Sequence, residues 1–246
     1  MSVTDRHPTP QSQTCTYLYD TYLDHIDTRI CAVGTHEGSA WAAVEECIFH
    51  PQGGGQPADR GWIDDTPIVP VRDRATGLIL ARGQYSTSPF RIGQYVNTRI
   101  DRTTRLENSA HHTAGHLVEA AGRLQGWALA ANNHFPGQAR IDFVANDDVR
   151  LTSEVGRREI TAALRTTVRE AIAARLVVTS RIDPDGNRTV DIADIHSAPC
   201  GGTHVRTLGE LAEVAIPTIR VKRGRIRVSY SASYAPAGTP STTSAQ

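Results

Sequence analysis

Short apolar runs alternate with turn-forming residues over the first part of the chain. Gly, Pro or Asp separates the runs at close intervals, and no long helical period is visible there. Short strands divided by turn residues are typical of antiparallel sheets that close on themselves. The pattern predicts a small, barrel-like antiparallel β domain over residues 15–101, with apolar runs at 40–44, 47–49, 62–63, 68–71, 78–80 and 94–96.

From residue 102 onward the apolar period becomes helical in two places. Ser109 can cap a helix that continues to about Arg123, and a second helix starts near Thr152 or Ser153. Strands are predicted at 139–144, 176–181, 189–192 and 219–230. The segment 102–234 is therefore expected to form a two-layer α+β domain, with helices on a largely antiparallel sheet. The apolar stripes of the two helices consist of Leu117, Val118, Ala121 and Leu124, and of Ile160, Leu164, Val168 and Ile172.

Composition limits the class of protein. Residues 1–14 and 235–246 are polar, which predicts a disordered arm and a disordered tail. No segment approaches the ~18 apolar residues of a membrane span, and the four cysteines form no Cys-x-x-Cys pair, so we expect a cytoplasmic protein in a reducing compartment. Because the formal net charge is zero, a polyanionic partner would have to meet a local basic patch.

Three histidines and one cysteine form two pairs with metal-ligand spacing. His112 and His116 lie four positions apart on the first predicted helix, so their imidazoles share one face. Cys200 and His204 are also four apart, and the two glycines between them favour a tight loop. Three nitrogens and one thiolate favour zinc over magnesium or calcium.

Each pair alone is a weak signal, because histidines on helices are more often core or surface residues. Together, with Cys200 following His116 by 84 residues, the pairs are moderately specific. A metalloprotease would need Glu directly after the first histidine, where this chain has Thr113. Four protein donors also make a closed shell, whereas catalytic zinc usually keeps one position open. The sequence leaves open whether zinc would activate or only orient the substrate.

Three motifs carry a resemblance to a known family. AHHTAGHLV at 110–118 and CGGTHV at 200–205 resemble the two zinc-ligand motifs of the alanyl-tRNA synthetase editing domain, and FHPQGGGQPADRG at 49–61 resembles its Gly-rich motif. Weaker matches lie at 101–108 and 139–143. The chain is thus similar to stand-alone alanyl-tRNA editing proteins in the longer form with a Gly-rich β domain. Departures from the family pattern are His111, beside the helix pair, and the short loop at 183–187.

The resemblance implies a zinc-dependent trans-editing hydrolase that removes serine or glycine from mischarged alanine tRNA. A synthetase pocket for alanine excludes these two residues poorly, so a second hydrolytic site is useful. The glycine run at 53–55 is compatible with a plain inter-strand turn. With the resemblance, we expect the loop to pack towards an editing pocket that includes Gly54, Gly55, Gln56 and Thr113, with Gln56 contacting the substrate.

A basic segment lies near the end of the second domain. Residues 219–228 hold five cations and no acid, and in one continuous strand Arg223, Arg225 and Arg227 would share a face. The face could simply be solvated. With the resemblance, we expect Lys222 and these arginines to contact phosphates of the tRNA acceptor end.

Two other classes of function remain open from the sequence. The same pocket could belong to a repurposed aminoacyl hydrolase or transferase of a specialised metabolic pathway, since a fold does not fix a function. The chain could also be a non-catalytic tRNA-binding module stabilised by zinc. The first would act on small aminoacyl esters or carriers, and the second would bind tRNA and leave the ester intact.

Overall fold

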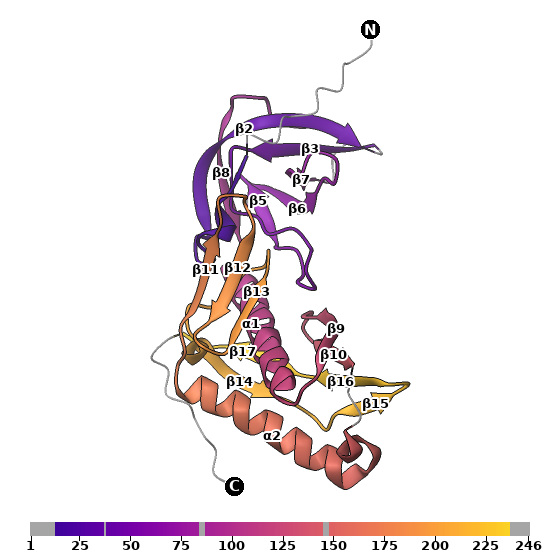
Figure 1. Cartoon of the computed structure of the whole chain (residues 1–246). Coiled ribbons are helices and arrows are strands. Elements are labelled where there is room, and N and C mark those ends of the chain that lie inside the picture. Colours follow the sequence, from indigo (N-terminus) through magenta and orange to yellow (C-terminus); the bar gives the residue numbers. More distant parts are fainter. Residues whose placement is uncertain (1–12, 37, 84–86, 145–147, 237–246) are drawn as a thin grey trace. The chain divides into compact units, whose positions relative to one another are not determined.

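The computed structural model describes residues 13–36, 38–83, 87–144 and 148–236 (Figure 1). Two compact units form within it. The first comprises Met1–Gly53 and Pro57–Arg105, and the second comprises Gly54–Gln56 and Leu106–Gln246. Three residues of the Gly-rich motif therefore belong to the second unit, although they lie in the first half of the sequence. Most of the predicted arm and tail, residues 1–12 and 237–246, lies outside the described residues.

Six strands of the first unit close a barrel, which confirms the predicted barrel-like antiparallel fold (Figure 1). All six pairings are antiparallel. Phe49, Ile30 and Ile63 are fully buried in its core. In order around the barrel the strands are β2 (His25–His36), β3 (Ser39–Val44), β7 (Ile79–Arg82), β6 (Thr66–Arg72), β5 (Gly61–Ile63) and β8 (Tyr95–Ile100).

The longest barrel strand, β2, was not predicted from the sequence. It contains few large apolar residues, and its first half pairs with β8 while its second half pairs with β3. A short strand, β1 (Thr14–Cys15), pairs in parallel with β4 (Glu46–Cys47). The 3₁₀ turn Thr16–Leu18 lies between β1 and β2. Gln13 anchors this start, because its side-chain amide donates to the carbonyls of Val44 and Ile79.

A buried ion pair within the first unit connects residues of two of the sequence motifs. The Arg105 guanidinium is 1% exposed; its Nε donates to Asp59 Oδ1 at 2.8 Å, and a second nitrogen contacts Asp59 Oδ2. It also donates to the carbonyls of Thr21 and Ile48. Because removing one partner would leave a buried charge uncompensated, Asp59 in the Gly-rich motif and Arg105 in the segment at 101–108 depend on each other.

Helix α1 spans Arg102–Leu124, so the predicted start at Ser109 is wrong. The cap is Asp101, whose carboxylate accepts both the backbone N–H and the hydroxyl of Thr104. Ser109 instead lies inside the helix, where its hydroxyl pairs with that of Thr203 at 2.7 Å. Leu124, predicted to be part of the apolar stripe, is 72% exposed at the end of the helix.

The second helix, α2 (Glu154–Ala173), begins as predicted. Ser153 caps it by accepting the N–H of Gly156 at 2.9 Å. Ile160, Leu164 and Val168 face a core shared with Leu117 and Val118 of α1. Two short 3₁₀ turns, Val149–Thr152 and Leu208–Glu210, flank the later elements. Among the described residues, no helix is both long and apolar enough to cross a membrane.

Within the described residues of the second unit, the strands form three separate sheets rather than the single predicted one. A four-stranded antiparallel sheet has the order β15 (Arg220–Lys222), β16 (Arg225–Ser229), β10 (Arg140–Val144) and β9 (Ala128–Asn133). A three-stranded sheet consists of β11 (Val178–Ile182), β12 (Arg188–Ile192) and β13 (His196–Pro199). The third pairs β14 (Leu211–Ala215) with β17 (Ser231–Tyr234).

The strand predicted at 219–230 is broken in its middle. Arg223 and Gly224 have φ angles of 52° and 70° and form the two-residue turn between β15 and β16. Positive φ at both central residues is what a tight hairpin requires. Arg223 therefore does not share a strand face with Arg225 and Arg227, which corrects the predicted arrangement.

Candidate metal centre

Helix α1 places two imidazoles side by side. The rings of His112 and His116 are stacked, with centroids 5.1 Å apart and planes inclined by 7°. Both residues are nearly fully buried, at 2% and 5% exposure. The predicted common face of the i and i+4 pair is therefore confirmed.

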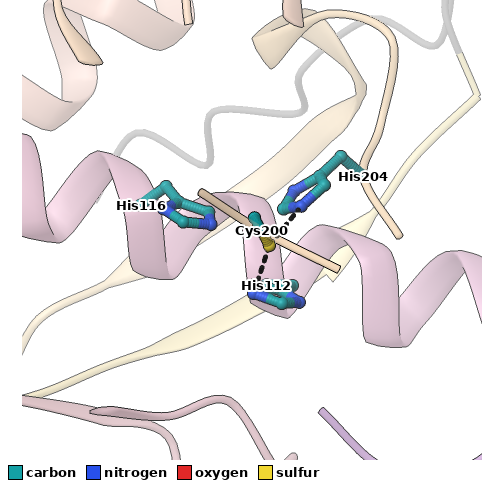
Figure 2. A group of neighbouring side chains, drawn as sticks. All are labelled: His112, His116, Cys200 and His204. Carbon is teal, nitrogen blue, oxygen red and sulfur yellow. Dashed lines mark hydrogen bonds between the residues drawn. The ribbon is translucent and has the colours of Figure 1, made fainter. Parts of the chain in front are cut away.

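The loop that follows β13 brings the second pair to the helix. Cys200 Sγ lies 3.4 Å from His112 Nε2 and 3.2 Å from His204 Nε2 (Figure 2). Gly202 makes this approach possible, because a Cβ atom there would lie 2.2 Å from the His112 ring. One donor atom from each of His112, His116, Cys200 and His204 lies within 4.8 Å of the others, and this group could hold a metal ion.

Gln56 determines which nitrogen of His112 faces this group. The backbone N–H of Thr203 donates to Gln56 Oε1 at 3.0 Å, and the amide NH₂ donates to the Thr203 hydroxyl at 2.8 Å. The amide oxygen is thereby fixed as an acceptor, so His112 Nδ1, 2.7 Å away, must carry the proton. A neutral His112 then presents an unprotonated Nε2 to the cluster, as a metal ligand requires.

The other two histidines also have a polar neighbour at Nδ1. His204 Nδ1 lies 3.2 Å from the Thr113 hydroxyl, which also accepts the N–H of Val205. His116 Nδ1 lies 2.9 Å from His196 Nε2. All three histidines thus have Nδ1 engaged by a neighbour, which leaves Nε2 for the cluster. Such contacts orient metal-bound histidines in proteins.

The chemistry of the donor atoms fits a bound cation. His116 Nε2 is buried and has no hydrogen-bond partner among the described residues. Burial, followed by the nearby His196, lowers the pKa of His116 to about 3, so its imidazole stays neutral. Burial raises the pKa of the Cys200 thiol, so a metal ion would have to displace its proton. A buried nitrogen without a partner is costly for an empty core and useful for a ligand site.

Two neighbours of His116 were missed by the sequence analysis. His196, on β13, contacts His116 directly, and Glu119 Oε2 lies 3.9 Å and 4.0 Å from the two imidazoles. Arg123 binds the other carboxylate oxygen of Glu119 at 2.6 Å. His196 precedes Cys200 by four residues, the same interval as in the two ligand pairs, and this spacing was the available signal.

The Gly-rich loop is fixed against the end of β9. The Gly55 carbonyl accepts the N–H of His134 at 2.8 Å, and Gly54 and Gly55 have φ angles of 56° and 78°. The His134 ring stacks on His112 with centroids 4.3 Å apart. Burial lowers the pKa of His134 to about 4, with a smaller contribution from His111. The loop and His134 therefore lie beside the candidate metal ligands.

The chain is similar in sequence to alanine–tRNA ligases and to alanyl-tRNA editing proteins. The chain is 30% identical over 237 residues to an alanine–tRNA ligase of Korarchaeum cryptofilum, covering 88% of this chain and 26% of the ligase. It is 27% identical over 234 residues to the alanyl-tRNA editing protein AlaX-L of Pyrococcus horikoshii, covering 89% and 57%. A Mus musculus alanyl-tRNA editing protein is 29% identical over 192 residues, covering 70% and 44%. The chain is a homologue of these proteins.

The relationship confirms the resemblance inferred from the sequence motifs. The chain spans less than two thirds of the length of each of these three homologues. No protein-family model matches the chain.

In this homologue of the editing proteins, the predicted site residues fall into two groups. Gly55, Gln56 and Thr113 lie with the four metal-ligand candidates in the second unit, but Gln56 and Thr113 are fully buried and support ligand histidines. Gly54 lies in the same loop. The basic residues belong to the β15–β16 hairpin, in a different sheet from the strand that leads to Cys200.

Proposed function

We propose that this chain is a zinc-dependent trans-editing hydrolase that deacylates alanine tRNA mischarged with serine or glycine. One observation carries the proposal: three imidazoles and a thiol converge within 4.8 Å in a chain homologous to alanyl-tRNA editing proteins. The donor set suits zinc because it combines nitrogen with sulfur in a number that completes a tetrahedron.

Some residues of the site would hold the metal ion, and others orient the residues that hold it. His112, His116 and His204 would hold zinc through Nε2 and Cys200 through Sγ, and the ion would supply Lewis-acid polarisation of the ester carbonyl or of a water molecule. Gln56 and Thr113 orient two of these imidazoles from behind. Because an aminoacyl ester is already activated, such positioning contributes a large share of the rate.

The charge pattern of the β15–β16 hairpin supports contact with tRNA phosphates. Arg220 lies directly opposite Arg227, and Lys222 opposite Arg225. Like charges directly opposite each other destabilise a hairpin. Of these four cations, Arg227 is the one that donates to the Asp142 carboxylate, with N···O distances of 2.7 Å and 3.0 Å. A polyanion on this face would relieve the repulsion between the cations. We therefore assign this face, together with Arg223 at the turn, to contact with phosphates of the tRNA acceptor end.

The test is deacylation of alanine tRNA charged with serine, glycine or alanine, with and without a zinc chelator. We expect chelator-sensitive loss of serine or glycine, with alanine spared. Cys200→Ala should lose bound metal and reduce the rate at least ~100-fold, since a ligand is removed, whereas Cys31→Ala in the barrel should change neither.

Three outcomes would overturn the proposal. Full activity and metal content in Cys200→Ala would exclude the metal site. Hydrolysis of small aminoacyl esters but not of charged tRNA would identify a repurposed enzyme. Salt-dependent tRNA binding with every ester left intact would identify a binding module.

A further inference from the structure

The His134 side chain lies within the candidate metal centre but outside the set of four ligands. It follows β9 directly, and its ring stacks on His112 at 4.3 Å and lies 6.2 Å from the His116 ring. It is 1% exposed. The His134 ring is therefore a direct neighbour of two of the candidate ligand imidazoles.

The hydrogen bonds of Tyr230 determine the tautomer of His134. The Tyr230 hydroxyl donates its proton to the carbonyl of His111 at 3.0 Å. It can then only accept from His134 Nδ1, which lies 2.6 Å away and must carry the ring proton. In the neutral ring Nε2 is consequently an acceptor. This atom is buried and has no hydrogen-bond partner among the described residues.

Two glycines make room for this imidazole. A Cβ atom on Gly115, in the middle of α1, would lie 2.3 Å from His134 Nδ1, and one on Gly55 would lie 3.0 Å from its Cδ2. Glycine inside a helix is unfavourable relative to alanine. An apolar side chain would fill the same space without burying an acceptor that finds no partner. The burial of a histidine at this position is explained if a bound ligand donates a hydrogen bond to His134 Nε2.

We propose that His134 Nε2 accepts a hydrogen bond from the side-chain hydroxyl of a seryl ester and so determines the preference for serine. The inference rests on the proposed function and names its preferred substrate. The serine hydroxyl is joined to the ester carbonyl through only two carbons, so it falls beside the metal centre when the carbonyl is there. Alanine and glycine offer no side-chain donor and would leave the buried acceptor unpaired, which is the strongest source of discrimination in such pockets.

Two conservative variants separate the two nitrogens of the ring. His134→Asn keeps an amide N–H near the position of Nδ1, where it can donate to Tyr230, and removes the acceptor at Nε2. His134→Gln places an amide oxygen near Nε2 instead. We expect kcat/KM for seryl-tRNA to fall by about tenfold or more in the Asn variant while that for glycyl-tRNA stays within about threefold, and to recover in part in the Gln variant.

The readout is the ratio of seryl to glycyl hydrolysis at equal metal content, because a merely structural role would lower both rates together. His50→Asn provides a matched control. His50 is a buried histidine of the barrel unit whose Nδ1 donates to the Pro57 carbonyl, so its replacement should leave the ratio unchanged. A seryl-to-glycyl ratio in His134→Asn equal to that of the unmodified protein would overturn the inference; a donor common to all aminoacyl esters would then be the partner of Nε2.

Binding of non-hydrolysable analogues provides a test that does not depend on turnover. The metal-loaded protein is titrated calorimetrically with 3′-serylamino- and 3′-alanylamino-3′-deoxyadenosine. We expect the seryl analogue to bind at least about tenfold more tightly, and His134→Asn to remove the difference. If the protein hydrolyses no ester, the proposed function fails, and the titration still decides on His134: equal binding of both analogues overturns the inference.

Discussion

At the scale of single residues, the candidate metal centre depends on side chains that would not touch the metal. Gln56 is held by the backbone and the hydroxyl of Thr203, and it fixes the proton of His112 on Nδ1. Thr113 and His196 contact Nδ1 of the other two histidines. The ligand geometry is therefore set by contacts between segments remote in sequence.

Replacing Gln56 tests this support. Gln56→Leu removes the acceptor of His112 Nδ1, and we expect metal affinity to fall by about 10- to 100-fold, as is typical when such a contact to a ligand is lost. Gln56→Glu keeps an acceptor oxygen and should retain most of the affinity. Competition with a chromophoric chelator measures both.

Gln52→Leu is the matched control for Gln56→Leu, because Gln52 lies in the same motif but is exposed. Unchanged metal affinity in Gln56→Leu would show that His112 holds its orientation without the amide.

At the scale of elements, the β15–β16 hairpin shows how one turn changes a surface. The sequence predicts a single strand with Arg223, Arg225 and Arg227 on one face. The turn at Arg223–Gly224 instead sets Arg220 and Lys222 against Arg227 and Arg225. The opposite face of β16 is apolar, with Ile226 and Val228 fully buried. The hairpin therefore concentrates positive charge on its exposed face.

Removing one like-charged pair from the hairpin tests its role. In the double variant Lys222→Ser with Arg225→Ser, tRNA affinity should fall and the slope of log K against log salt should decrease by about 0.9 for each lost phosphate contact. Thermal stability should stay constant or rise, because a repulsive cross-strand pair is gone. Filter binding over a salt series measures the slope.

The control is Arg158→Ser with Arg169→Ser, which removes two exposed cations from α2. A salt slope equally reduced in this control would show that the hairpin has no special role in binding.

The barrel was predictable as a class because short apolar runs between turn residues are a local signal. β2 was not found, since its few large apolar residues are interspersed with polar ones. The start of α1 was misplaced because two capping residues compete locally: Ser109 is a plausible cap, but Asp101 accepts the first-turn hydrogen bonds. Such competition is settled by packing, because α1 already contributes the buried Leu106 on the N-terminal side of Ser109.

At the scale of the whole molecule, each unit has its own apolar core. The candidate ligands all belong to the second unit, where they connect α1 with a loop 84 residues further along the chain. A bound ion would therefore stabilise the second unit selectively, since ligands that bind only the folded state shift its stability by mass action.

Metal removal should consequently loosen one unit and spare the other. After chelation, we expect backbone amides at 109–118 and 200–205 to exchange with deuterium about tenfold faster or more, while the barrel strands β3 and β8 exchange unchanged. Hydrogen exchange with mass spectrometry measures both in one experiment. The Cys200→Ala protein should already show the faster exchange without chelator, and equal changes in the two units would contradict the prediction.

The sequence by itself determined what depends on local spacing. The four-residue intervals of the two ligand pairs, the period of α2 and the alternation of runs and turns in the barrel are properties of neighbouring residues, and the motifs were sufficient to predict the relationship to the editing proteins. Only the tertiary structure decided which nitrogen of each histidine is available, that Gln56 supports His112, and that His134 presents a buried acceptor. These features arise from contacts between residues far apart in the chain, and no local period encodes them.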